Sequence, residues 1–285
     1  MNGRAQTKHE WNGHGYYSLD GQTLSEAKKM VVFLHGGLKN PLFKTNDKIT
    51  LDYLIEENEY FLELIKEKEY GLIVPLTDNK LNWVENTEYC YLYLKTLISE
   101  KAGEKKVLIT GFSDGGTGAY RMFYEHPDYF EGAVIFNGYP QRNNYHDSVN
   151  YKSVTDKNIV FASTTKDKQI PYEFLMTEYA QQKQFNGSTY FIVNEGKHTF
   201  SAYDLKALNT IFDLLNQKPG VDKIMQEPLH GLVYNDSLHY LYKYRPSVVR
   251  KYYYGKSFCL RNKIQIKELK KKGFKSQKMA LKDLN

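Results

Sequence analysis

The residues with the clearest chemical signature form a Gly-x-Ser-x-Gly motif at positions 111–115, with Ser113 at its centre. The segment 106–110 before it is short and apolar, as buried strands are, and 115–125 has a helical pattern. A serine between such elements lies on a sharp turn that lifts its hydroxyl above the sheet edge. Side chains at 111 and 115 would collide with the neighbouring strand and helix, which explains the two glycines. The motif predicts a nucleophilic serine; the alternative is an ordinary helix cap in a glycine-rich turn.

A serine hydroxyl is a weak nucleophile alone, so a base must lie beside it. His198 follows the apolar segment 189–193 and precedes a helical pattern at 202–217. It should therefore lie at the carboxyl end of a strand, on the same sheet edge as Ser113. We expect His198 to be the base. Among the other candidates, His126 fits a helix end, His35 a strand end and His146 a polar loop. His230 and His239 lie in the C-terminal region, beyond the predicted catalytic domain.

The acid that orients the histidine should come from the loop after the preceding strand, 158–162. Asp167 is the only carboxylate in the loop 163–171, whereas Asp156 precedes the strand and belongs to the opposite edge. We expect Asp167 to be the acid. It could also cap the helix that begins near Pro171, and one residue can do both.

A tetrahedral intermediate needs two preorganised hydrogen-bond donors. One should be the backbone N–H of Asp114, the residue after the nucleophile. The second should come from the glycine-rich loop after the first buried strand, 29–35. Gly37 is the expected donor, with Leu38 behind it; the alternative is a simple glycine turn.

Strands and helices alternate around these residues, which predicts an α/β fold with a doubly wound, mostly parallel sheet. Continuous apolar runs indicate strands buried on both faces, and apolar stripes indicate helices. An early hairpin is expected around 16–21, and Ser201 is expected to cap the last helix. The expected strands are 29–35, 71–76, 106–110, 132–136, 158–162 and 189–193, and the expected helices are 50–66, 86–101, 115–125, 171–183 and 202–217.

With these motifs in this order, the chain resembles the α/β-hydrolase superfamily over residues 28–217. Within it, 111–140 is similar to feruloyl esterases, polyhydroxybutyrate-depolymerase-like enzymes and dienelactone-hydrolase-like proteins. The shared features are the extra glycine after the motif, a helix ending in His-Pro-Asp and a strand of small residues. The resemblance implies a Ser113–Asp167–His198 triad, an acyl-enzyme mechanism on a carboxylic ester, and neither cofactor nor metal. Thr164 departs from the resemblance, because glycine is usual there.

The expected substrate is a small-molecule ester. The span 137–157 is too short for a large helical lid, which favours soluble, modest-sized esters over long lipid chains. Four aromatic residues are expected to form the walls of the binding pocket, although each could equally be core packing: Phe112, Trp83, Tyr139 and Phe200. A serine peptidase or a thioesterase on the same triad is the alternative activity.

We expect a catalytic domain, 1–219, and a Tyr- and Lys-rich extension, 220–285, which falls outside the resemblance. Residues 243–285 hold 14 of the 39 Lys and Arg residues but 2 of the 33 Asp and Glu residues, so the preceding 242 residues carry a net charge of −6. Basic residues interleaved with tyrosines can bind an anionic partner, either nucleic acid or a membrane surface. The alternative is a solvated tail packed on the acidic domain.

The remaining composition favours a globular protein with its own core, since 41% of its residues are hydrophobic. Cys90 and Cys259 are too few for a disulfide framework. No basic, apolar leader begins the sequence, and no run approaches the ~18 apolar residues of a membrane span. We therefore expect a cytoplasmic protein without a transmembrane segment.

Overall fold

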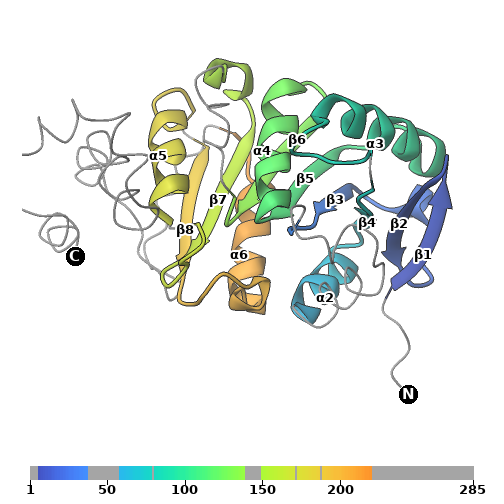
Figure 1. Ribbon diagram of the computed structural model, residues 1–285, viewed down its shortest axis with the longest axis horizontal. Coiled ribbons are helices and arrows are strands. Elements are labelled where there is room, and N and C mark those ends of the chain that lie inside the picture. Colours follow the sequence, from blue (N-terminus) through green and yellow to red (C-terminus); the bar gives the residue numbers. More distant parts are fainter. Residues whose placement is uncertain are drawn as a thin grey trace, which may run out of the picture.

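A central sheet dominates the protein, as a computed structural model shows for residues 6–37, 58–138 and 149–219, apart from positions 79, 171 and 187 (Figure 1). Within these residues the sheet has eight strands in the order β1-β2-β4-β3-β5-β6-β7-β8. The strands β1 and β2 pair antiparallel, β2 meets β4 antiparallel, and all later pairs are parallel. The strands are β1 Gln6–Trp11, β2 His14–Leu19, β3 Met30–Leu34, β4 Gly71–Pro75, β5 Val107–Phe112, β6 Phe130–Phe136, β7 Asn158–Thr164 and β8 Thr189–Asn194.

Helices cover both faces of this sheet, which confirms the predicted doubly wound α/β fold. In Figure 1, α3, α4 and α5 lie on one face, and α2 and α6 lie on the other. Two hydrophobic clusters match these layers, one between the sheet and α3–α5 and one between the sheet and α2 with α6. The helices are α2 Glu59–Glu67, α3 Thr87–Ala102, α4 Asp114–Glu125, α5 Tyr172–Gln182 and α6 Leu205–Leu215, with short 3₁₀ turns at Leu24–Glu26, Tyr151–Val154 and Phe200–Ala202.

Burial on both faces explains why the central strands have continuous apolar sequences. Every residue of β3, β4, β5 and β7 is buried, so no position alternates to a polar residue that faces water. Parallel pairing brings the carboxyl ends of β3, β5, β6, β7 and β8 to one edge of the sheet. The loops that follow these strands therefore meet at that edge.

The structure corrects two details of the predicted elements. The early hairpin turns at Asn12 and Gly13, not within 16–21; both have positive φ, 49° and 78°, as a tight hairpin turn requires. The last helix is capped by Asp204, not Ser201, because the Asp204 side chain accepts a hydrogen bond from the backbone N–H of Ala207. Ser201 lies in the 3₁₀ turn before it.

Some expectations fall on residues that the structure does not describe. The front of the predicted helix 50–66 lies outside the described residues, and α2 begins at Glu59 after an Asn58 cap. Much of the span 137–157 and the whole extension 220–285 also lie outside them. The binding of an anionic partner by the extension therefore stays a prediction. Among the described helices, none has the length and apolarity needed to cross a membrane.

Candidate active site

Ser113 lies on the sharp turn between β5 and α4, with φ 58° and ψ −119°. This positive-φ conformation strains a non-glycine residue, and such strain persists only where the surrounding structure holds the residue in place. The close backbone packing at the two flanking glycines shows how tightly this turn is held. A Cβ on Gly111 would lie 2.3 Å from the carbonyl oxygen of Gly115, and a Cβ on Gly115 would lie 1.8 Å from that of Leu34. The turn therefore excludes side chains at both positions, as the motif predicted.

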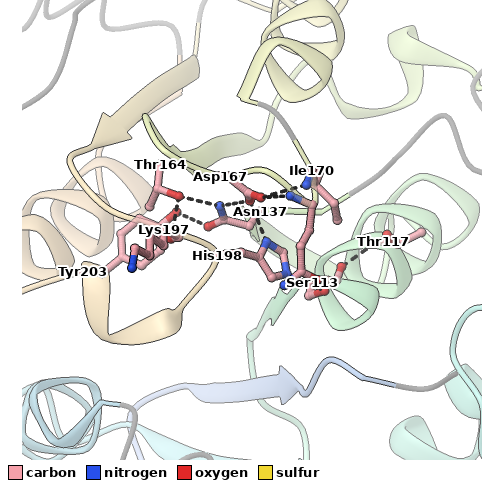
Figure 2. Close-up of polar contacts among 10 residues, drawn as sticks. Ser113, Thr117, Asn137, Thr164, Asp167, Ile170, Lys197, His198 and Tyr203 are labelled. Carbon is pink, nitrogen blue, oxygen red and sulfur yellow. Dashed lines mark hydrogen bonds and ion pairs between the residues drawn. The ribbon is translucent and has the colours of Figure 1, made fainter. Parts of the chain in front are cut away.

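His198 stands between Ser113 and Asp167 and is within hydrogen-bond distance of both (Figure 2). Its Nε2 lies 2.9 Å from Ser113 Oγ, and its Nδ1 lies 2.6 Å from Asp167 Oδ2. Because an ionised carboxylate can only accept, Nδ1 carries the proton and Nε2 is left to accept the Ser113 hydroxyl proton. The three side chains come from the loops after β8, β5 and β7, respectively. The structure thus brings together all three residues that the sequence singled out.

Asp167 is held by donors on both of its carboxylate oxygens. Its Oδ1 accepts the backbone N–H groups of Gln169 and Ile170, both at 2.8 Å. Its Oδ2 accepts His198 Nδ1–H and also the side-chain amide of Asn137, at 2.7 Å. The side chain is fully buried. Asp167 therefore pairs with the histidine and closes the turn over Gln169 and Ile170, which lies before the first residue of α5, Tyr172, and so is not shown to cap that helix.

Asn137, which sequence reasoning did not select, links Asp167 to the strands around it. It follows β6 with φ 44°, and it is fully buried. Its Nδ2 also lies 3.0 Å from Thr164 Oγ1, and its Oδ1 accepts the Tyr203 hydroxyl at 2.5 Å. Thr164 Oγ1 in turn donates to the carbonyl of Lys197 at 2.9 Å, beside His198. The threonine that replaces the usual glycine thus ties the end of β7 to the histidine loop.

The glycine loop after β3 lies directly against the serine. A Cβ on Gly36 would lie 2.9 Å from Ser113 Cβ, so only glycine allows this approach. The next residue, Gly37, has φ 79°, a conformation that also favours glycine. Asp114 is the first residue of α4, at the positive end of the helix dipole. The backbone N–H groups of Asp114 and Gly37 stay the predicted donors, while Leu38 lies outside the described residues.

Three of the four expected pocket aromatics are buried in the protein core. The Phe112 ring packs against the ring of His198, with centroids 4.9 Å apart. Phe200 is fully buried and packs on Phe112 and other core rings. Trp83 is also fully buried, against the ring of His35 and the glycine face of α4. These three side chains therefore belong to the core on the two faces of the sheet, and Tyr139 lies outside the described residues.

Two other candidate histidines, His126 and His35, lie among the described residues and make different contacts. His126 ends α4, as expected, and stacks on Tyr91 with ring centroids 3.4 Å apart. His35 lies at the end of β3, where its Nδ1 donates to the Gly36 carbonyl at 2.8 Å. Burial lowers the pKa of His35 to about 4, against partial compensation from that hydrogen bond and the Asp114 charge. His35 is therefore neutral at pH 7. No group of three potential metal ligands occurs among the described residues.

Comparison with known proteins gives matches to solved structures only. No protein family matches the sequence, and no curated protein matches it. An esterase from Pyrococcus furiosus, Pf2001, aligns over 75% of this chain and 90% of its own, with 13% identity and a TM-score of 0.55. The fluorophosphonate-binding serine hydrolase F of Staphylococcus aureus aligns over 74% of this chain and 98% of its own, with 13% identity and a TM-score of 0.52.

A thermostable esterase aligns over 73% of this chain with 15% identity and a TM-score of 0.53. This chain spans 62% of that esterase's length. Likeness at such identities concerns the backbone, not the reaction. The strand order, the helix layers and these structural neighbours agree on one architecture: the chain has the α/β-hydrolase fold.

Proposed function

We propose that this protein is a serine hydrolase that cleaves carboxylic esters through an acyl-enzyme intermediate. The observation that carries the proposal is the position of His198. Its two ring nitrogens lie 2.9 Å from the Ser113 hydroxyl and 2.6 Å from the Asp167 carboxylate. A hydroxyl on a strained turn, a base within reach of its proton and a buried carboxylate behind that base are the requirements of nucleophilic acyl transfer.

In the first half-reaction, Ser113 Oγ attacks the ester carbonyl carbon as its proton moves to His198 Nε2. The carbonyl oxygen becomes an oxyanion, which the backbone N–H groups of Asp114 and Gly37 stabilise. Asp167 stabilises the imidazolium and keeps its own charge. The intermediate then collapses: the bond between carbonyl carbon and alcohol oxygen breaks, and His198 returns the proton to the leaving alcohol.

In the second half-reaction, water replaces the alcohol. His198 Nε2 takes a proton from the water as its oxygen attacks the acyl carbon, and a second oxyanion forms in the same place. Collapse breaks the bond to Ser113 Oγ, which recovers the proton from His198. The products are a carboxylic acid and a free serine, so the cycle needs no co-reactant other than water.

Esters are the preferred substrate class for two reasons. The segment 111–140 resembles feruloyl esterases and related enzymes, and two of the structural neighbours reported above bear the name esterase. A thioesterase or a peptidase would use the same three residues, so the leaving group is the part of the proposal that needs a direct comparison.

The test is a panel of matched acyl donors: p-nitrophenyl esters of increasing chain length, an acyl thioester and an aminoacyl amide. The proposal expects the highest kcat/KM on a short ester, with a loss of roughly 10⁴-fold or more in Ser113→Ala. Ser153→Ala is the matched control, because this half-buried serine lies on the 3₁₀ turn Tyr151–Val154 and its hydroxyl donates to the Asn150 carbonyl, not to a residue of the proposed triad. Turnover that survives in Ser113→Ala would reject the mechanism, and faster amide or thioester cleavage would reassign the substrate.

A further inference from the structure

Asn137 occupies an unusual place beside the Asp167–His198 pair. Its Nδ2 donates to the same carboxylate oxygen, Asp167 Oδ2, that accepts the proton of His198 Nδ1 (Figure 2). The backbone N–H groups behind Asp167 bind only the other oxygen, Oδ1. They anchor one oxygen of the carboxylate and leave its rotation to be fixed at the other oxygen, where Asn137 is the one donor besides the histidine among the residues that the structure describes.

The network around Asn137 determines which way its amide points. The Thr164 hydroxyl donates its proton to the Lys197 carbonyl, so its oxygen can only accept from Asn137. The Asn137 side chain must therefore turn its Nδ2 toward Thr164. The Tyr203 hydroxyl donates to Asn137 Oδ1, so the amide oxygen must point toward Tyr203. With Asp167 accepting as well, three independent partners agree on one orientation of the amide.

Tyr203 remains a donor over the whole working range of pH. Burial, together with the negative charge of Asp167, raises the pKa of the Tyr203 hydroxyl well above its usual value. A phenol that stays protonated cannot turn into an acceptor that would repel Oδ1 of Asn137. The amide therefore cannot flip without losing the Tyr203 hydrogen bond and placing its oxygen against the carboxylate.

We propose that Asn137 is a positioning residue: its amide, oriented by Tyr203, holds Asp167 Oδ2 on His198 Nδ1 and so keeps the proton of the neutral imidazole on Nδ1. This assignment rests on the proposed function, since only an imidazole with Nε2 unprotonated can take the proton of Ser113 Oγ. The consequence for the reaction is that Asn137 sets the fraction of His198 that can act as a base. Its side-chain hydrogen bonds go to Thr164, Asp167 and Tyr203, not to Ser113.

The variant that tests this must remove the amide without straining the backbone. Asn137 has a positive φ, so alanine would add strain of its own, whereas glycine accepts the same conformation. In Asn137→Gly, kcat on a p-nitrophenyl ester should fall roughly 10- to 100-fold, the range expected for a lost hydrogen bond to a charged group, while KM stays within about twofold. Tyr203→Phe keeps the ring and should lower kcat in the same direction by a smaller factor.

A second readout is independent of turnover. The ¹⁵N chemical shifts of the His198 ring, measured where the imidazole is neutral, report which nitrogen carries the proton. The proposal expects Nδ1–H in the wild type and a shift toward a mixture of tautomers in Asn137→Gly and Tyr203→Phe. Unchanged tautomers in both variants would overturn the assignment, whether or not the protein cleaves esters. An inactive wild type whose variants still lose the Nδ1–H form would instead reject the proposed function alone.

Asn158→Ala is the matched control for general loss of structure. Asn158 is also buried and its Nδ2 also makes two hydrogen bonds, to the carbonyls of Leu215 and Gln217, but it begins β7 at the opposite edge of the sheet. It should lower the melting temperature and leave kcat and the His198 tautomer as in the wild type. An equal loss of kcat in Asn158→Ala would mean that Asn137 acts through stability, and the proposal would fall.

Discussion

The buried histidine beside the glycine loop makes stability depend on pH. His35 is 2% exposed, and burial lowers its pKa from the ordinary value of 6.5 to about 4. The unfolded chain therefore takes up a proton below pH 6.5, whereas the folded protein does so only near pH 4. Because the unfolded state binds more protons in this interval, the contribution of His35 to stability is fully present above pH 6.5 and is lost as the pH falls toward 4.

The size of the effect follows from the two pKa values. At pH 5 the unfolded histidine is almost fully charged and the folded one almost fully neutral. Integrating the proton uptake from pH 7 to pH 5 gives a loss of about 2 kcal/mol in unfolding free energy, and about 3 kcal/mol when complete near pH 4. For a domain of this kind, about 2 kcal/mol is a large part of the total stability.

The assay compares the wild type with His35→Asn, in which the Asn amide can replace the Nδ1–H donor to Gly36 but does not titrate. Urea unfolding at pH 7, 6 and 5, followed by tryptophan fluorescence, gives the free energy for each protein. Other carboxylates and histidines titrate equally in both, so their contributions cancel in the difference. The wild type should lose about 2 kcal/mol more than His35→Asn between pH 7 and 5. Parallel pH profiles would mean that His35 gains a proton in the folded state too, and the burial argument would be refuted.

Three further changes have distinct expected outcomes. Asp167→Asn should lower kcat by about 10⁴-fold, because the imidazole then favours the wrong tautomer; steady-state ester hydrolysis measures this, and wild-type kcat would contradict it. Gly115→Ala should not give a native fold, since its Cβ would lie 1.8 Å from the Leu34 carbonyl; circular dichroism of a cooperative, folded variant would refute that. Asp204→Ala should lower the unfolding free energy by about 1 kcal/mol through loss of the cap to Ala207, with kcat unchanged; an unaltered urea midpoint would contradict the capping role.

Much of the fold was predictable because its causes are local. Strands buried on both faces, such as β5 and β7, leave a continuous apolar run that periodicity detects. The glycines at 111 and 115 report a steric requirement of the backbone, so the turn at Ser113 could be recognised before its neighbours were known. His198 and Asp167 followed from the rule that loops after parallel strands share one edge.

The hydrogen-bond partners of the acid could not be found in this way. Asn137 and Tyr203 are 66 residues apart, and their hydrogen bond depends on how the loop after β6 meets the 3₁₀ turn before α6. The one local signal was the asparagine before Gly138, a pair that often adopts positive φ. That signal indicates a turn, but it does not indicate which carboxylate the amide will reach.

The aromatic residues expected to line a pocket were the least informative part of the sequence. Trp83 and Phe200 were expected as pocket walls, yet both are fully buried in the core. A large apolar side chain has the same sequence signature in both settings, because burial by protein and burial by a ligand favour the same residue types. The early hairpin was misplaced for a similar reason: Asn12-Gly13 and Asp20-Gly21 are both turn signals, and only the register of β1 on β2 distinguishes them.

Covalent labelling tests the central claim most directly. A fluorophosphonate probe reacts with a serine hydroxyl only where a base activates it and donors stabilise the resulting tetrahedral adduct. Intact mass spectrometry with peptide mapping should find one adduct per folded chain, on Ser113, and none on Ser113→Ala or on urea-unfolded protein. A folded protein that stays unlabelled, or that carries the adduct on another residue, would contradict the account.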